Sequence, residues 1–486
     1  MAKFYVTTSI PYVNTEPHIG FGMELVQADV LARYHRQQGD NVLFSAGTDE
    51  HGGKIAEKAA EAKMAPKEFA DRVSQSFREV LKVLSISSDR FIRTTDSGHE
   101  QRAQLIWQKL AAAGHIYKGK YSGWYCTGHE EYFPEKVVKD NKGVCPDHNR
   151  PYEKLVEENY FFKASAMAAQ IAEAITTDVF RVVPGSRKNE ILSVLKAGLT
   201  DTSVSRPKDK ISWGIAVPGD ENQVMYVWFE ALMNYITVLG YPEHADFKTY
   251  WPADIQVIGK DILRFHAAIW PAMLLALGLK LPKSLYVHGF VNINNQKISK
   301  TLGNVIAPRQ VVEKYGTDAT RYFLTRHIPS YGDGDFTWEM MEAAYNSELA
   351  NQLGNAVSRT AAMITKYQNG IIGEVPPAEH DVAAYSSHLQ DYRFDKALDE
   401  VWEQVKGLNQ YIDESKPWEV AKTGDEEHLR EVLAYLASNL LEIASLLAPF
   451  MPDTAAKIQS TFGTGVLKPL PASLFPKHQT TPQPAP

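Results

Sequence analysis

The stretch that decides the fold spans residues 4–47 and reads FYVTTSIPYVNTEPHIGFGMELVQADVLARYHRQQGDNVLFSAG. It opens and closes with short apolar runs, residues 4–10 and 41–47, that are typical of strands. Between them, apolar residues recur at helical spacing, namely Met23, Val26, Val30 and Tyr34, and Gly39 suits the end of a helix. A strand, a helix and a strand of these lengths predict a right-handed parallel unit.

The turn between the first strand and the helix carries His18, in the sequence "PHIG". Ligands of such sheets bind at the carboxyl ends of the strands, and a helix N-terminus there attracts phosphate. Gly20 and Gly22 allow close approach of the backbone, and His18 offers an imidazole donor beside the phosphate path. The stretch therefore suits a nucleotide site, although a proline-rich turn with an incidental histidine explains it equally well.

The rest of the chain divides by pattern. Parallel-sheet character returns near residue 254, with expected strands at 254–259 and 284–292 around a helix at 260–278. The polar and aromatic segment between the two halves predicts an insertion of roughly 90 residues in one α/β domain. After about residue 340 only amphipathic helices are expected, and the tail 477–486 suits a disordered segment.

Composition narrows the function. The chain has 486 residues, a net charge of −7, and two cysteines, Cys126 and Cys145. The negative charge excludes a protein that is basic all over, so a polyanion would need a local patch. The scarcity of cysteine favours a reducing compartment, and no apolar run approaches a membrane span. We expect a cytoplasmic protein that does not enter the membrane.

A second loop, "NNQKISKTLGN" (residues 294–304), follows the last expected strand. Its lysines, Lys297 and Lys300, could close over a triphosphate and neutralise the charge of departing pyrophosphate. A solvated lysine loop is the alternative interpretation.

Together, "PHIG" and "KISKT" resemble the HIGH and KMSKS signatures of class I aminoacyl-tRNA synthetases. Five further stretches are similar to the methionyl-tRNA synthetase family: TTSIPYVNTEPHIG, SAGTDEHG, YVWFEALMNY, IGKDILRFHAAIWPAML and DESKPWEVAK. The resemblance implies that methionine and ATP, with Mg²⁺, give methionyl-adenylate, and that the methionyl group passes to tRNA(Met) for initiation and elongation. It implies catalytic roles for His18, Lys297 and Lys300, and ATP binding by His18, Gly20, Gly259, Asp261 and Lys300.

One residue departs from the family pattern. Phe21 stands where the family usually has a second histidine, and a phenyl ring cannot donate to phosphate. Phe21 alone favours the alternative of a catalytically weak tRNA-binding paralogue of the same fold. Ligases for valine, leucine or isoleucine carry a much larger editing insertion, which this chain has no room for.

The resemblance also implies an amino-acid pocket. Asp49 would bind the ammonium group, and aromatic rings suit a thioether. The implied pocket residues are Ile10, Tyr12, Asp49, Trp228, Ala231, Leu232, Tyr235, Ile262 and His266. From the residues alone, a buried core helix at 225–235 and a core histidine at 266 are the simpler interpretations.

The insertion contains Cys126-x-x-His129 and Cys145-x-x-His148. Two paired ligand sets at this spacing suit one tetrahedral zinc ion, and a shell without an open position predicts a structural role. Surface thiols or a knuckle without metal are the alternatives.

The helical region resembles the family's anticodon-binding bundle, which implies base contacts by Asn355, Arg359 and Trp418; a core tryptophan and a solvated arginine are the alternatives. No appended dimerising domain is seen, so we expect a monomer. The expected fold class is thus an α/β class I synthetase, with a Rossmann-type parallel sheet split by a zinc-knuckle connective insertion and followed by an all-α anticodon-binding bundle. The expected limits are 1–115 and 206–305 for the Rossmann halves, 116–205 for the insertion, 306–345 for a linker region that contacts the tRNA stem, 346–476 for the bundle and 477–486 for the tail.

Overall fold

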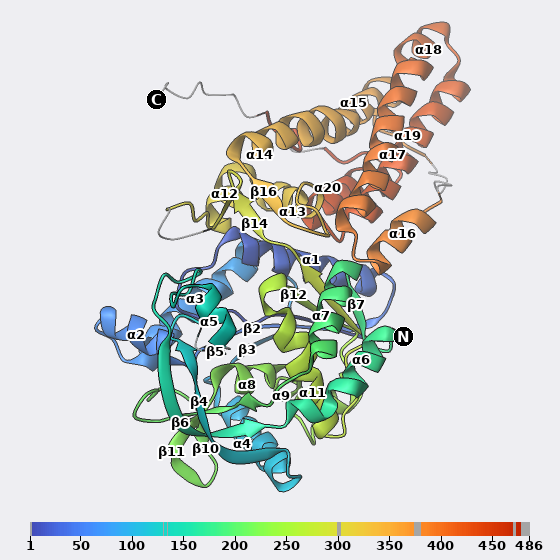
Figure 1. Cartoon of the computed structure of the whole chain (residues 1–486). Coiled ribbons are helices and arrows are strands. Elements are labelled where there is room, and N and C mark those ends of the chain that lie inside the picture. Colours follow the sequence, from blue (N-terminus) through green and yellow to red (C-terminus); the bar gives the residue numbers. More distant parts are fainter. Residues whose placement is uncertain are drawn as a thin grey trace. The chain divides into compact units, whose positions relative to one another are not determined.

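The computed structural model describes residues 2–129, 131–133, 135–298, 303–373, 381–469 and 473–477 (Figure 1). The chain forms two compact units, each assembled from several segments. Unit 1 comprises residues 1–16, 40–79 and 88–287, and unit 2 comprises residues 17–39, 80–87 and 288–486.

Unit 1 is built on a six-stranded sheet in the order β3-β2-β1-β12-β13-β7. Strand β1 pairs with β2 and β12, β2 pairs with β3, and β13 pairs with β7, in each case parallel. The strands are β1 (Lys3–Thr8), β2 (Asn41–Thr48), β3 (Arg90–Arg93), β12 (Ile255–Gly259), β13 (Ser284–His288) and β7 (Arg181–Val183). Because β12 and β13 lie far along the chain from β1, the sheet is assembled across an insertion, as the sequence predicts.

The insertion has its own antiparallel sheet, in the order β5-β4-β6-β8. Its long strands are β4 (Ile116–Cys126) and β6 (Glu153–Phe162), with short β5 (Glu131–Phe133) and β8 (Thr202–Ser203) at the edges. Strand β7 is different, because it lies within the range 116–205 and yet pairs with β13 in the parallel sheet. Three residues between helices α6 (Ala168–Thr176) and α7 (Gly185–Ala197) give too short a pattern to be assigned from sequence.

The core of unit 1 joins both parts. Phe162, at the end of the insertion strand β6, packs in one cluster with Trp107, Phe229, Tyr235 and Trp270. These four come from helices α4 (Ser97–Ala112), α8 (Val227–Leu232), α9 (Asn234–Thr237) and α11 (Trp270–Ala276). The cluster fixes α8 and α9 beside the end of the parallel sheet.

Unit 2 begins with α1 (Ile19–Gln37). The sequence predicts one buried face, but every residue of α1 from Ile19 to Ala32 except Gly20 is buried. Its fully buried Asp29 is paired: this side chain accepts from Arg33 Nε at 2.7 Å and lies 2.8 Å from Nη1 of Arg321, which is also fully buried. Arg321 belongs to α13 (Thr317–Arg326) and also donates to the carbonyl oxygens of Leu84, Pro449 and Phe450.

The expected single strand over residues 284–292 is wrong. The structure ends β13 at His288 and starts β14 (Val291–Ile293) in another sheet, with β15 (Gln296–Lys297) and β16 (Gly334–Phe336). A Cβ atom on Gly289 would lie 1.8 Å from the carbonyl oxygen of Gly332, so two backbones meet where the strand breaks. Only glycine fits such an approach.

Beyond β16 the described residues form helices, as predicted. They are α14 (Trp338–Ala344), the π-helix η4 (Tyr345–Gly354), α15 (Asn355–Gln368), α16 (Ala383–Gln390), α17 (Phe394–Ser415), α18 (Pro417–Thr423), α19 (Glu426–Leu447) and α20 (Pro452–Phe462). One more helix, α12 (Pro308–Tyr315), lies before β16 and directly before α13. Helix α17 packs against α16 and α19. No helix in the described ranges combines the length and hydrophobicity of a membrane span. Residues 478–486 of the expected disordered tail lie outside the described residues.

Candidate active site and metal site

Unit 1 contains a small cavity where the loop after β1, the end of β2 and helices α8 and α9 meet. Its lining includes eight of the nine residues of the predicted amino-acid pocket: Ile10, Asp49, Trp228, Ala231, Leu232, Tyr235, Ile262 and His266. Ser9 and Asn234, which the sequence did not single out, complete it. The ninth residue, Tyr12, packs edge-on against Trp228 with ring centroids 5.6 Å apart. Segments more than 200 residues apart therefore converge on one apolar cavity with one acid.

Backbone hydrogen bonds place Asp49 at the cavity. Its N–H donates to the carbonyl oxygen of Pro11 at 2.9 Å, and its own carbonyl oxygen accepts from the N–H of Val13 at 3.1 Å. These bonds tie the loop after β1 to the end of β2. The Asp49 side chain is only 2% exposed. A carboxylate in such a position favours a cationic partner over water.

His266 reaches the cavity from a widened helical turn. The expected single helix at 260–278 is a 3₁₀ turn, η2 (Lys260–Ile262), a π-helix, η3 (Phe265–Ile269), and α11. Pro271, near the start of α11, lacks the N–H that would continue the helical ladder, and π turns are frequent at functional sites. Nδ1 of His266 donates to the carbonyl oxygen of Ile262 at 3.0 Å, so Nε2 accepts from the hydroxyl of Tyr235 at 2.7 Å. His266 is thus both a satisfied buried histidine and a wall of the cavity.

Aromatic stacking supports Trp228 from a residue outside the cavity lining. The ring of Phe265 lies parallel to that of Trp228, with centroids 4.4 Å apart. The sequence analysis missed Phe265, because a stacking partner 37 positions away leaves no local pattern.

His18, in unit 2, is the N-cap of α1. Its Nδ1 accepts a hydrogen bond from the N–H of Gly20 at 3.2 Å. Burial lowers the pKa of His18, so the ring is neutral and its proton sits on Nε2, which is left as a donor. A Cβ atom on Gly20 would lie 3.1 Å from the imidazole, so glycine makes room for this cap. His18 and Gly20, both predicted from the sequence, therefore form the N-cap of α1 together.

Phe21 is 8% exposed in the first turn of α1. A histidine there would be a buried polar ring rather than a solvent-facing donor.

Two of the remaining predicted nucleotide-binding and catalytic residues, Gly259 and Lys297, lie at ends of strands. Gly259 is the buried last residue of β12, and Asp261 follows it in η2 with an exposed side chain. Lys297 ends β15, where its Nζ lies 5.3 Å from the ring centroid of Phe290. Lys300 lies outside the described residues.

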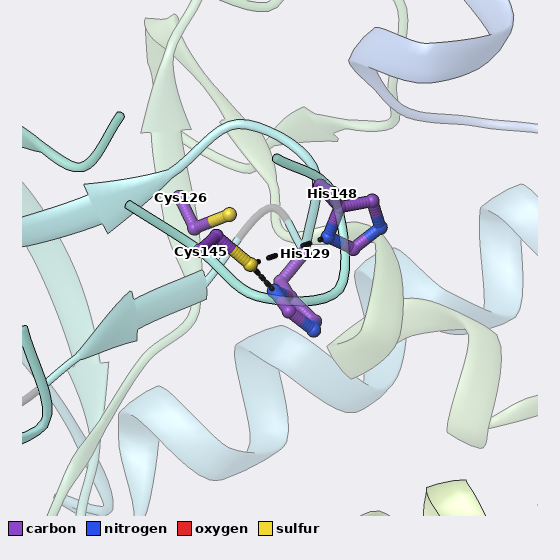
Figure 2. Close-up of side chains that lie close together, drawn as sticks. All are labelled: Cys126, His129, Cys145 and His148. Carbon is purple, nitrogen blue, oxygen red and sulfur yellow. Dashed lines mark hydrogen bonds between the residues drawn. The ribbon is translucent and has the colours of Figure 1, made fainter. Parts of the chain in front are cut away.

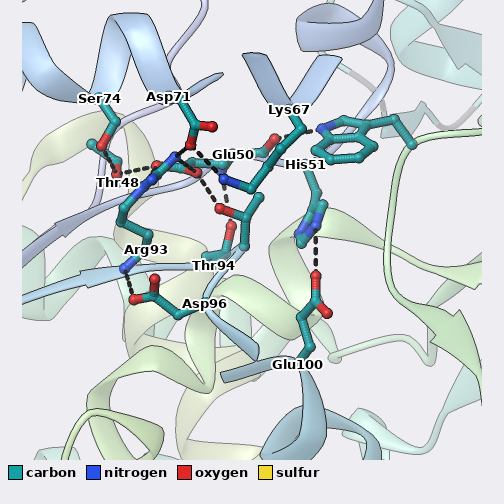
Figure 3. A network of polar contacts seen from close by, with 12 residues as sticks. Thr48, Glu50, His51, Lys67, Asp71, Ser74, Arg93, Thr94, Asp96 and Glu100 are labelled. Carbon is teal, nitrogen blue, oxygen red and sulfur yellow. Dashed lines mark hydrogen bonds and ion pairs between the residues drawn. The ribbon is translucent and has the colours of Figure 1, made fainter. Parts of the chain in front are cut away.

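A polar network that the sequence analysis missed follows Asp49 (Figure 3). Glu50 is fully buried and forms two hydrogen bonds of 2.7 Å with Arg93 of β3. It also accepts from the hydroxyls of Thr48 and Thr95 at 2.7 and 2.5 Å. The backbone N–H of Glu50 donates to Thr94 Oγ1 at 2.9 Å. This bidentate pair locks the end of β2 to β3.

The four predicted metal ligands come together in the insertion (Figure 2). One potential ligand atom from each of Cys126, His129, Cys145 and His148 lies within 4.8 Å of the other three. Cys145 Sγ is 3.4 Å from Nδ1 of His129 and 3.6 Å from Nδ1 of His148. A small core of Val138, Tyr152 and both cysteines supports the two turns.

The residues fit a zinc ion. Ligand bonds of about 2.0–2.3 Å in a tetrahedron place neighbouring ligand atoms about 3.3–3.8 Å apart, and the two sulfur–nitrogen distances agree. Nε2 of His129 lies 3.3 Å from Asp147 Oδ2, the outer carboxylate contact that zinc-ligating histidines typically make. Burial first, and then the neighbouring His129, lower the pKa of His148 to about 4, so its ring is neutral as a ligand must be.

The three predicted anticodon residues lie in the helical bundle. Asn355 and Arg359 are one turn apart on α15. Arg359 donates to Asp413 at 2.8 Å, and its guanidinium lies 5.7 Å from the ring centroid of Trp418 in α18. Arg359 and Trp418 are both partly exposed, so neither is a core residue or a fully solvated charge.

Comparisons with known proteins agree with this architecture. Residues 4–154 and 148–361 match the family described as "tRNA synthetases class I (M)", and residues 364–473 match the "Anticodon binding domain of methionyl tRNA ligase". The chain is 44% identical to the methionine–tRNA ligase of Caldanaerobacter subterraneus subsp. tengcongensis, over 95% of this chain and 74% of that protein. The corresponding protein of Thermotoga maritima is 41% identical over 94% and 74%. The structure of Mycobacterium tuberculosis methionyl-tRNA synthetase in complex with methionyl-adenylate has a TM-score of 0.90 at 35% identity, covering 98% of this chain and 100% of that one.

The split parallel sheet, its Cys/His insertion and the following helical bundle define a class I aminoacyl-tRNA synthetase, which confirms the predicted fold class. Within that class, the chain belongs to the methionyl-tRNA synthetase family. Its activity is that of a methionine–tRNA ligase.

Proposed function

We propose that the cavity in unit 1 binds methionine, with Asp49 holding the ammonium group. The observation that carries this proposal is the convergence of eight predicted residues on one cavity. Ile10, Ala231, Leu232 and Ile262 supply apolar walls, while Trp228, with Tyr12 behind it, faces the thioether. Such contacts of sulfur with aromatic rings are favourable. The hydrogen-bonded side chains of Tyr235 and His266 supply a polar part of the cavity wall.

Adenylate formation follows from the second part of the proposal. The methionine carboxylate attacks the α-phosphorus of ATP, and pyrophosphate leaves. His18 donates from Nε2 to the phosphate path, Gly20 keeps this cap in place, and Gly259 and Asp261 contact ATP. Lys297 and Lys300 offset the charge that develops on pyrophosphate. Mg²⁺ enters with ATP and supplies charge neutralisation.

Amino-acid-dependent exchange between ATP and pyrophosphate tests this assignment. Methionine should stimulate exchange far more than leucine, isoleucine or valine. Asp49→Asn should raise the KM for methionine, because the ammonium group loses its charged partner, while the KM for ATP stays the same. Equal stimulation by leucine, or an unchanged methionine KM in Asp49→Asn, would refute the pocket.

The insertion is proposed to hold one structural zinc ion per chain through Cys126, His129, Cys145 and His148. The ligand set fills a tetrahedron, so the ion would brace the two turns and take no part in the reaction. Elemental analysis of purified protein should give about one zinc per chain, as four ligands imply. Cys145→Ala should lose the metal and destabilise the insertion.

The bundle is proposed to read the anticodon of tRNA(Met), both initiator and elongator. Trp418 would stack on an unpaired base, while Asn355 and Arg359 would bond base edges. Trp418→Ala should raise the KM for tRNA in aminoacylation and leave ATP–pyrophosphate exchange without tRNA unchanged. Arg90→Ala, which removes an ion-paired surface arginine of unit 1, is the control and should change neither.

The domain limits given by the sequence, 1–115, 116–205, 206–305, 306–345, 346–476 and 477–486, stay a proposal, with β7 as the strand that returns from the second range to the parallel sheet. A monomer and a cytoplasmic location are also proposed, the latter because the reaction serves translation. Light scattering of the purified chain tests the monomer.

A further inference from the structure

Three buried ionisable side chains lie behind the cavity in unit 1. Glu230 is fully buried, and His99 and His51 are 2% and 3% exposed. Each oxygen of Glu230 has one imidazole partner: Oε1 lies 2.8 Å from Nδ1 of His51, and Oε2 lies 2.8 Å from Nε2 of His99. His99 continues through Nδ1 to the hydroxyl of Thr237 at 2.8 Å. None of these side chains lines the cavity.

The contacts join the two walls of the cavity. Glu230 is on α8, the helix that supplies Trp228, Ala231 and Leu232 to the lining. His51 stands two residues after Asp49, on the far side of the anchored Glu50. A single carboxylate therefore connects the segment that carries the acidic residue of the cavity with the helix that carries its apolar wall.

Opposite charges on His51 and Glu230 strengthen this connection between the two walls. Burial by itself lowers the pKa of His51, but the charge of Glu230 and hydrogen bonds with Glu100 and Glu230 raise that pKa to about 10. Glu100 lies at the outer side of His51, with Oε1 3.6 Å from Nε2 (Figure 3). The ring centroids of Trp213 and His51 are 5.2 Å apart. A buried carboxylate that kept its charge without its cationic partner would be strongly unfavourable.

We propose that Glu230 is a positioning residue for methionine: through His51 and His99 it sets the spacing between Asp49 and the Trp228 wall. This inference rests on the proposed methionine pocket, and it identifies the residue that fixes the width of that pocket. A pocket whose walls are held rigidly discriminates between side chains that differ by one methylene, whereas a loosened pocket binds the true substrate less well and its homologue relatively better.

The test is Glu230→Gln in the full chain, measured by ATP–pyrophosphate exchange without tRNA. The amide keeps the shape and removes the charge that holds His51. We expect the KM for methionine to rise about 10–100-fold, the scale set by the loss of one hydrogen bond to a charged group, with the KM for ATP unchanged. The preference for methionine over its S-ethyl homologue should fall.

Two further measurements separate positioning from simple loss of stability. Titration of active sites by adenylate formation gives the fraction of folded enzyme, which corrects kcat and leaves KM unaffected. His51→Gln should raise the methionine KM in the same direction, and the double variant should be no worse than Glu230→Gln, because both changes remove one interaction. If Glu230→Gln does not fold, His51→Gln alone decides the question.

Glu348→Gln is the matched control. Glu348 pairs with a histidine in the same way, with Oε2 2.8 Å from Nε2 of His327, but it belongs to unit 2. It should leave the methionine KM unchanged. A wild-type methionine KM in both Glu230→Gln and His51→Gln, or an equal rise for methionine and ATP, would overturn the inference. If methionine fails to stimulate the unmodified enzyme, the proposed pocket itself fails.

Discussion

Gly128 offers a sharp test of the zinc site, because it touches the site without being a ligand. A Cβ atom at this position would lie 2.3 Å from Cγ of His148 and 2.7 Å from its Cβ and Cδ2. Carbon atoms in contact are separated by about 3.5–4.0 Å, so Gly128→Ala must push the imidazole away by roughly 1 Å or more. The backbone of Gly128 is not in the left-handed region, so the substitution adds no strain of its own.

Zinc does not follow such a shift, because its ligand distances are held to within about 0.2 Å. Gly128→Ala should therefore detach His148 and weaken zinc binding by at least about 10–100-fold, the loss that follows when a group orienting a zinc ligand is changed. The measurement is the zinc dissociation constant, obtained by competition with a chromophoric chelator at neutral pH.

The matched control is Gly119→Ala, in strand β4 of the same insertion. There the new Cβ would lie 3.5 Å from the rings of Phe161 and Tyr117, which is ordinary contact. The control should bind zinc as the unmodified protein does. A Gly128→Ala protein with the zinc affinity of this control would refute the assignment of His148 as a ligand.

Four further predictions concern unit 2. His18→Ala should lower the rate of single-turnover adenylate formation more than about tenfold, because one such donor supplies up to about 10²–10³ in rate; an unchanged rate would contradict this. Phe21→His should also lower this rate, since the new imidazole would be buried, and a raised rate would contradict that expectation. Lys300→Ala should lower the adenylation rate with the methionine KM nearly unchanged, because its contact exists mainly in the transition state. Asp29→Asn should cost about 3–5 kcal/mol of unfolding free energy at neutral pH by leaving Arg321 unpaired. Burial raises the pKa of Asp29, but the charge of Arg321 outweighs burial and holds this pKa below its usual value. The difference in unfolding free energy between the unmodified protein and Asp29→Asn, measured by denaturant unfolding, should therefore shrink only as the pH falls below about 4.

Local pattern was enough for much of the fold. The strands near residues 4–10 and 41–47, the Cys/His insertion and the helical region all follow from spacing that a short window contains. It was not enough for β7, because three residues carry no period, nor for the break at Gly289, because its cause is the backbone of Gly332. Helix α1 shows the same limit: its amphipathic pattern predicts one face, yet the surrounding segments bury both.

The residues of the candidate site likewise divide into those that the sequence could identify and those that only the fold identifies. Asp49, Trp228 and His266 could be named because they sit in stretches that resemble a known family, and family stretches are dense around residues that touch substrate. Glu230 also lies in one of those stretches but was not predicted as a site residue, because a glutamate in an otherwise apolar helix is expected on the solvent-exposed face. Only the fold shows that this face is covered by His51 and His99, which are separated from Glu230 by 179 and 131 positions. A charge in an apolar helix is costly unless it is paired, so an acid that persists at such a position signals a buried partner that the sequence cannot identify.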